Sequence, residues 1–145
     1  MVGFHGVYAV EGVNLDTSFL IELLRKEQRA FDKGATLAED GIPQRVPSPV
    51  LYELEYGVEM YGDEDEKRAI ANLNRLYPIV RVNEGIARKA ARLIAAADRA
   101  EGGPGETGID DIDPMIAAIA ASVDEPVLTD NVTDFEQLGV TVETW

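Results

Sequence analysis

The sequence contains no cysteine and only one histidine, His5, among its 145 residues. Disulfide bonds and thiolate metal sites are therefore excluded, and so are zinc sites built from several histidines. Any metal ion that this chain binds must be held by oxygen atoms. The first residues lack the basic region and apolar core of a signal peptide, and no run of eighteen apolar residues occurs. We therefore expect a cytoplasmic protein that does not enter a membrane.

Basic residues are also scarce, because 13 Lys and Arg stand against 27 Asp and Glu, which gives a net charge of −14. The imbalance is concentrated in residues 100–145, which contain no Lys or Arg. Self-repulsion of this size largely disappears at molar salt, where the screening length falls to about 3 Å. The composition thus favours a halophilic organism, such as a halophilic archaeon, as the source.

The chain length fits one domain, and hydrophobic periodicity predicts strands that alternate with helices. We expect strands at residues 13–15, 78–82, 126–129 and 140–145. We expect helices at 19–31, at 48–60 with Ser48 as N-cap, at 63–76, after an N-cap at Asn83, from Asp113, and as a turn at 133–138. Residues 32–46 and 102–108 are expected to be loops. This alternation favours a three-layer α/β/α domain around a mainly parallel sheet.

Acidic and amide side chains follow two of the expected strands. Asp16 ends the first strand, Asp130 and Asn131 follow the strand at 126–129, and Asp113 begins the helix that leads into it. Ligand sites of open parallel sheets lie at the carboxyl ends of the strands. Carboxylates that converge there repel one another and raise each other's pKa unless a cation neutralises them. Because only oxygen ligands remain, the pattern points to Mg²⁺ or Mn²⁺.

Each acid also has a simpler structural interpretation. Asp113, directly before a proline, has the pattern of a helix N-cap. Asp110 and Asp111 are most simply solvated loop charges. Asp16 at a strand-to-helix junction fits a cap, and Asp134 fits turn chemistry. Taken one at a time, the patterns favour these structural roles.

The helix expected at 48–60 carries two candidate glutamates that periodicity does not separate. Glu53 and Glu55 flank its apolar stripe almost symmetrically. Gly57 leaves room beside Glu53, whereas Glu55 stacks over Glu59, and like charges at this spacing prefer water. This favours Glu53 slightly but leaves both open.

Four segments, taken together, resemble the PIN-domain ribonucleases, and among them the VapC-type toxins of toxin–antitoxin pairs. They are VNLDTSFLIELL (13–24), SPVLYELEYG (48–57), DPMIAAIAA (113–121) and PVLTDNVTDFEQLGVTVETW (126–145). Each is a weak pattern alone, but their order and spacing together are specific. The resemblance implies a PIN domain over residues 13–145. Residues 1–12 are then an N-terminal extension of unknown role: a disordered leader, an added strand, or the result of a start codon placed before Val13.

The resemblance also implies the roles of site residues. It makes Asp16, Glu53, Asp113 and Asp134 the catalytic acidic quartet, with Asp16 and Asp113 as direct metal ligands. It implies that Asp113 both caps its helix and turns its carboxylate towards the metal. The supporting positions are Ser18 and Thr129, whose hydroxyls orient carboxylates, the polar residue Asn131, and Asp130. Relatives often carry a basic or neutral residue at Asp130, so it is either an additional ligand or part of the acidic surface.

The implied function is that of a Mg²⁺-dependent endoribonuclease toxin, with Mn²⁺ as a possible substitute, that hydrolyses RNA phosphodiester bonds. A cognate antitoxin would silence it, and a homodimer is expected. Phosphate contacts normally need basic residues. These gather at Arg25, Lys26, Arg29 and Lys33, and again at Arg81, Arg88, Lys89, Arg92 and Arg99. The alternative is that they only offset neighbouring acids on solvated helix faces.

Two other function classes share parts of the pattern. A non-catalytic PIN-like interaction domain would have the same fold, but it would not need all four acids. A receiver-type phospho-signalling domain also places aspartates, Mg²⁺ and a threonine at strand ends. It needs a lysine late in the chain, and residues 100–145 contain none.

Overall fold

The structure is a computed structural model that describes residues 11–145. Residues 1–10, including His5, lie outside the described residues, so the predicted extension is seen only at Glu11 and Gly12. Five strands form one sheet in the order β3-β2-β1-β4-β5. They are β1 (Val13–Leu15), β2 (Gln44–Pro47), β3 (Ile79–Val80), β4 (Val127–Leu128) and β5 (Val142–Glu143). Every pairing between neighbouring strands is parallel, which confirms the predicted sheet.

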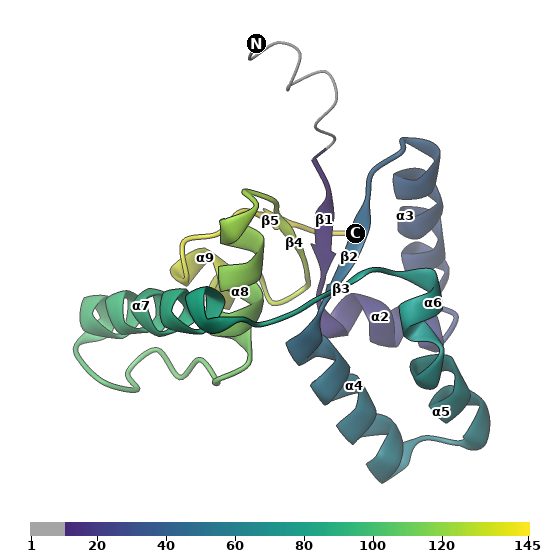
Figure 1. Cartoon of the computed structure of the whole chain (residues 1–145), viewed down its shortest axis with the longest axis horizontal. Helices are drawn as coiled ribbons and strands as arrows, with labels where there is room; N and C mark the ends of the chain where they lie inside the picture. Colours follow the sequence, from purple (N-terminus) through teal and green to yellow (C-terminus); the bar gives the residue numbers. More distant parts are fainter. Residues whose placement is uncertain (1–10) are drawn as a thin grey trace.

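Helices cover both faces of this sheet. They are α2 (Thr17–Leu24), α3 (Gln28–Glu39), α4 (Ser48–Tyr61), α5 (Glu64–Ala71), α6 (Leu73–Leu76), α7 (Glu84–Glu101), α8 (Asp113–Ser122) and α9 (Val132–Gln137). Figure 1 shows α7, α8 and α9 on one side of the sheet and α2, α3, α5 and α6 on the other, while α4 extends past the carboxyl ends of the strands. The predicted three-layer α/β/α domain is confirmed. Within residues 11–145, no helix has the length and apolar character needed to cross a membrane.

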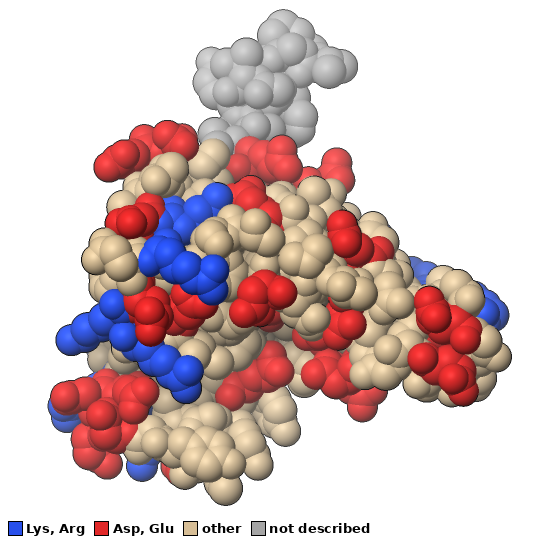
Figure 2. Space-filling model, turned by 180° about the vertical axis from the view of Figure 1, so that it is seen from behind, with Lys and Arg blue, Asp and Glu red and all other residues tan. Residues whose placement is uncertain are grey.

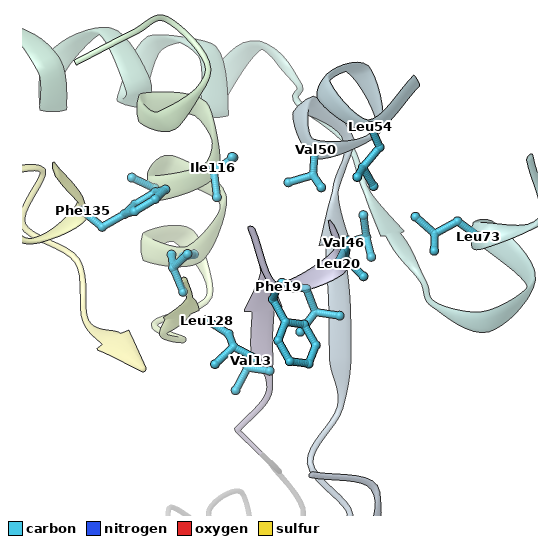
Figure 3. Close-up of a cluster of buried hydrophobic side chains, with 14 of the residues drawn as sticks. Val13, Phe19, Leu20, Val46, Val50, Leu54, Leu73, Ile116, Leu128 and Phe135 are labelled. Carbon is cyan, nitrogen blue, oxygen red and sulfur yellow. The ribbon is translucent and has the colours of Figure 1, made fainter. Parts of the chain in front are cut away.

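The hydrophobic core lies on both faces of the short strands. β1 is buried along its whole length, as expected for a strand covered on both sides. Figure 3 shows Ile116 and Phe135 from one helical layer and Phe19 and Leu20 from the other, all buried around the strands. Each such side chain contributes about 1.5–3 kcal/mol through burial. This packing fixes the strand ends, and with them the residues that follow each strand.

The loop predicted at residues 32–46 is wrong, because this segment contains most of α3 and all of β2 except its last residue. Helix α3 buries only Ala30 and Leu37. Two buried residues are too few to produce a hydrophobic repeat that would predict the helix from the sequence. In β2 the sequence QRVP offers one branched apolar residue, Val46. The helix predicted at 19–31 is also broken in two, since the chain turns at Lys26 with a φ of 60°.

A predicted helix start is confirmed where the side chain of the predicted N-cap accepts a hydrogen bond from a backbone N–H. Asn83 accepts the backbone N–H of Ile86 at 2.9 Å, as predicted for the start of α7. The cap predicted at Ser48 is wrong, because Ser48 is already helical. Its Oγ instead accepts the N–H of Val82 at 3.3 Å, which ties α4 to the segment after β3.

Candidate metal centre

Asp16 lies at the carboxyl end of the central strand β1 and is 5% exposed. The neighbouring strand β4 is followed by Thr129, whose hydroxyl donates a hydrogen bond to Asp16 Oδ2 at 2.6 Å. Thr129 Oγ1 also accepts the backbone N–H of Asn131 at 2.9 Å. The end of β4 therefore fixes the orientation of the Asp16 carboxylate.

Asp113 and Asp134 meet through a shared amide. Asp113 begins α8 and is 7% exposed, while Asp134 lies in the first turn of α9. The Nδ2 of Asn131 donates to Asp113 Oδ2 at 2.9 Å and to Asp134 Oδ2 at 3.1 Å. Asn131 therefore holds together two carboxylates that are 21 residues apart in the sequence.

Glu53 reaches the same end of the sheet from α4. The hydroxyl of Thr17, the residue after Asp16, donates to Glu53 Oε1 at 2.5 Å. Glu53 is half-buried, whereas Glu55 is exposed. The structure thus separates the two glutamates that periodicity left open. Thr17 was not predicted as a site residue, although its place beside Asp16 at the start of a helix was a usable signal.

Two of the predicted supporting residues lie at the margin of the site. Ser18 Oγ accepts the backbone N–H of Asp130 at 3.3 Å, and within residues 11–145 no carboxylate is its hydrogen-bond partner. Asp130 is exposed, but its charge contributes to raising the pKa of Asp16. The two residues join the start of α2 to the end of β4.

The helix cap predicted at Asp113 is wrong, and Asp110 has that role. Asp110 Oδ1 accepts the N–H of Ile112 at 3.0 Å and that of Asp113 at 2.9 Å. The backbone is already helical at Ile112, with φ −83° and ψ −47°, so the cap position falls before it. Asp113 makes no capping hydrogen bond, which leaves its carboxylate available to the site. Asp110 therefore caps the amino end of α8 and is not simply a solvated charge in a loop.

The carboxylates at this end of the sheet perturb one another. Burial, together with the nearby charges of Asp110, Asp16, Glu53 and Asp134, raises the pKa of Asp113 to about 7. Burial also raises the pKa of Asp16, against the hydrogen bond from Thr129, and that of Glu53, against the hydrogen bond from Thr17. No ion pair in the described part of the chain involves a member of the quartet. The negative charge is thus crowded, buried and uncompensated.

The donor set fits a hard divalent cation. The groups that could ligate a metal here are carboxylate oxygens, which suit Mg²⁺ and Mn²⁺, while the Thr17 and Thr129 hydroxyls and the Asn131 amide orient them. Among the side chains of residues 11–145, no three acidic or histidine groups lie close enough to hold one ion between them. Mg²⁺ keeps several waters and often takes only one or two carboxylates directly. An ion here would therefore have at most two direct carboxylate ligands, with the other acids acting through water.

The comparisons with known proteins agree with this arrangement. A family model described as PIN domain matches residues 13–140. The chain belongs to the PIN domain family. No curated protein matches its sequence.

Solved structures with the same PIN fold include several toxin–antitoxin complexes. One is DNA-bound VapBC from Salmonella typhimurium, with 23% identity and a TM-score of 0.78, covering 94% of this chain and 99% of that one. Another is VapBC2 from Rickettsia felis bound to a promoter DNA fragment, with 18% identity and a TM-score of 0.77, covering 92% and 98%. VapBC-5 from Mycobacterium tuberculosis has 27% identity and a TM-score of 0.62, covering 94% and 98%.

Within residues 11–145, the basic side chains of the PIN domain form no ion pair with the quartet, and several are paired elsewhere. Figure 2 shows acidic side chains scattered in patches across one face, with Lys and Arg gathered over α3 and the turn that precedes it. In that group Arg29 pairs with Glu22, and Lys33 with Glu143. In the second predicted group Arg88 pairs with Glu84. The remaining basic residues of the two groups form no ion pair within residues 11–145; they are Arg25, Lys26, Arg81, Lys89, Arg92 and Arg99.

Proposed function

We propose that this chain is the toxin of a VapBC-type toxin–antitoxin pair and acts as a metal-dependent endoribonuclease. The observation that carries the proposal is the convergence of buried Asp16 and Asp113 with Glu53 and Asp134 at the carboxyl end of the sheet, without a basic partner. Buried carboxylates with raised pKa values, such as Asp16 and Asp113, are typical of catalytic sites. The PIN family membership and the likeness to VapBC complexes support the same function.

The chain's own residues would prepare the site for phosphodiester hydrolysis. Asp16 and Asp113 would hold Mg²⁺ or Mn²⁺, with Glu53 and Asp134 completing the shell through water. When bound, the metal supplies an activated water and stabilises charge on the phosphate and the leaving oxygen. The hydrogen bond from Thr129 fixes Asp16, and the one from Thr17 fixes Glu53. The expected products are a 5′-phosphate and a 3′-hydroxyl.

We further propose that a cognate antitoxin silences the enzyme and that the chain forms a homodimer. The antitoxin is supported by the similar solved structures of VapBC proteins, one of them described as a member of a family of toxin–antitoxin systems. The homodimer is an expectation from the family resemblance. An antitoxin that brings basic groups would offset the acidic site electrostatically. A halophilic source and a cytoplasmic location remain predictions from composition.

A non-catalytic PIN-like interaction domain is the alternative. Buried carboxylates without a basic partner destabilise the folded chain, and a domain that only binds a partner gains nothing from keeping them. A receiver-type phospho-signalling domain remains disfavoured, because it needs a lysine late in the chain and residues 100–145 contain none.

The test is incubation of the purified chain with defined RNAs in molar salt, with Mg²⁺, with Mn²⁺, or with EDTA. We expect cleavage with either metal, none with EDTA, and none by Asp16→Ala or Asp113→Ala variants that keep the wild-type circular dichroism spectrum. Cleavage that persists in EDTA, or in either variant, would reject the proposed site.

A further inference from the structure

A cleft of about 240 Å³ runs between α2 and α4, and one of its walls is a residue of the acidic site. Glu53 lines this α2–α4 cleft while its Oε1 accepts the hydrogen bond from Thr17. From Glu53 the cleft follows α4 past Gly57 to Tyr61, two turns and about 12 Å further along the helix. Whatever occupies the cleft therefore lies directly beside the quartet.

We propose that the α2–α4 cleft receives one unpaired base of the RNA strand whose phosphate lies at the acidic site. This inference rests on the function proposed above, because it extends the same site to a neighbouring nucleotide. The reaction at the quartet is unchanged by it, and what it adds is a binding subsite with named residues.

The shape and walls of the cleft suit a single planar group. Its volume is below the roughly 300–1,000 Å³ of pockets for drug-sized ligands, so neither a helix nor a long peptide segment fits inside. Leu54 and Val58 form part of an apolar floor, and Tyr61, which is 84% exposed, stands at the outer end. Proteins bind unpaired bases by stacking them on aromatic rings against such apolar surfaces.

The charges around the cleft indicate how a nucleotide would lie. Arg25 lines the cleft, is exposed, and has no ion-pair partner within residues 11–145. Glu53 and Glu66 also line it, and Glu66 Oε1 accepts the N–H of Asp63 at 3.1 Å. Two carboxylates exclude a phosphate from the interior. An uncharged base therefore enters, and the phosphate beside it stays at the mouth, next to Arg25.

Gly57 provides a way to close the cleft without disturbing the fold. A Cβ added at Gly57 would meet no atom within 4 Å. Alanine and leucine both favour a helix over glycine, so substitution there should not lower the melting temperature. Gly57→Leu would fill the cleft, while Gly57→Ala would add only one methyl group. The two variants form a graded pair at one position.

The experiment measures fluorescence anisotropy of a labelled, mixed-sequence single-stranded RNA decamer with the full chain in EDTA, where no cleavage is expected. Gly57→Leu and Tyr61→Ala should each weaken binding by about tenfold, within the range found for loss of one base–aromatic stack. Gly57→Ala should have a smaller effect than Gly57→Leu. Tyr52→Ala removes an exposed tyrosine of the same helix outside the cleft and should bind like wild type.

A second matched pair of variants distinguishes binding in the cleft from non-specific electrostatic attraction of RNA. Arg25→Asn and Lys26→Asn each remove one positive charge from adjacent positions, but only Arg25 lines the cleft. Arg25→Asn should weaken RNA binding several-fold more than Lys26→Asn, because only it removes a contact at the mouth. Equal losses would indicate non-specific attraction and would overturn the subsite.

The outcomes also separate this inference from the proposed function. If wild type binds and cleaves RNA and Gly57→Leu does so equally well, the cleft is not a base subsite, although the nuclease proposal stands. If Gly57→Leu keeps full RNA binding but loses its complex with the antitoxin, the cleft belongs to the protein partner and the inference is overturned. If wild type neither binds nor cleaves RNA, both proposals fail.

Discussion

Buried carboxylates at the two ends of the sheet differ in whether they have a positively charged partner. At the amino end Glu125, 6% exposed, accepts hydrogen bonds from the backbone N–H of Gly12 at 2.9 Å and the amide of Asn14 at 3.2 Å. It also pairs with Arg45, whose Nε and Nη2 donate at 3.1 and 2.9 Å. At the carboxyl end Asp16 and Asp113 are equally buried, but among residues 11–145 their partners are only hydroxyl and amide groups. Within this described part, the chain neutralises the first charge with Arg45 and gives the second no positive partner.

The amino end is also closed by packing. A Cβ at Gly12 would meet the carbonyl oxygen of Pro43 at 2.8 Å and Glu125 Oε2 at 2.9 Å, so a larger residue does not fit. Gly12 is thus part of the folded domain, although the family match begins at Val13. Burial alone therefore does not mark an acid as a candidate functional residue, whereas burial without a positive partner does.

The largest effect is expected on activity at the carboxyl end. Asp16→Asn or Asp113→Asn should lower the rate of RNA cleavage by more than about a hundredfold. Removing a group that only orients a metal ligand typically costs 10- to 100-fold, and removing a ligand itself costs more. Single-turnover cleavage in Mn²⁺ measures the loss. If both variants retain more than a tenth of the activity, the two ends of the sheet do not differ in function.

At the amino end the expected effect is on stability instead. Arg45→Met leaves Glu125 buried without its cation and should lower the free energy of unfolding by about 2–4 kcal/mol, slightly below the range for breaking a fully buried pair, because Arg45 is 28% exposed. Urea unfolding in molar salt measures this loss of stability. Cleavage by the folded variant should match wild type, and a selective loss of activity would show that Glu125 also serves the site.

A third prediction concerns pH without metal. The folded-state pKa of Asp113, about 7, lies above its ordinary value of 3.8, so ionisation of this group destabilises the fold as pH rises from about 4 to 7. Asp113→Asn should therefore unfold at the same urea concentration as wild type at pH 4. At pH 8 in EDTA it should be more stable by about 2 kcal/mol, roughly half of what the full shift corresponds to, since neighbouring acids respond together. Equal stability of the two at pH 8 would contradict the crowding of charge.

The smallest effect is expected at Thr17. Thr17→Val removes the hydrogen bond to Glu53 but keeps the shape of the side chain, so cleavage should fall by about tenfold with little change in melting temperature. Thr17→Ser should restore most of the rate. Ser18→Ala is the neighbouring control, because within residues 11–145 the only hydrogen bond of the Ser18 Oγ is with the backbone N–H of Asp130.

The residues that the sequence predicts well are those with a strong local pattern. The strand at Val13–Leu15 was placed correctly because two apolar residues precede the aspartate at its end. The helix after Asn83 was placed correctly because a side-chain cap marks its start. The α3 and β2 elements were missed because each buries only one or two apolar side chains. Their stability comes from tertiary packing, which local periodicity does not record.

The same limit applies to the candidate site. Strand ends indicated Asp16 and the neighbourhood of Thr129, but the choice of Glu53 over Glu55 needed the family resemblance, and the structure supports it through Thr17. The roles of Asp110 and Thr17 were missed. Both depend on where a helix begins to within one residue, and sequence patterns do not resolve that.

Binding of Mn²⁺, followed by electron paramagnetic resonance at molar salt, tests most directly whether the carboxyl-end carboxylates hold a divalent cation. Wild type should bind the ion, and Asp16→Asn and Asp113→Asn should each weaken binding by more than about tenfold, while Arg45→Met should not. Equal Mn²⁺ affinity in wild type and both aspartate variants would contradict the metal centre.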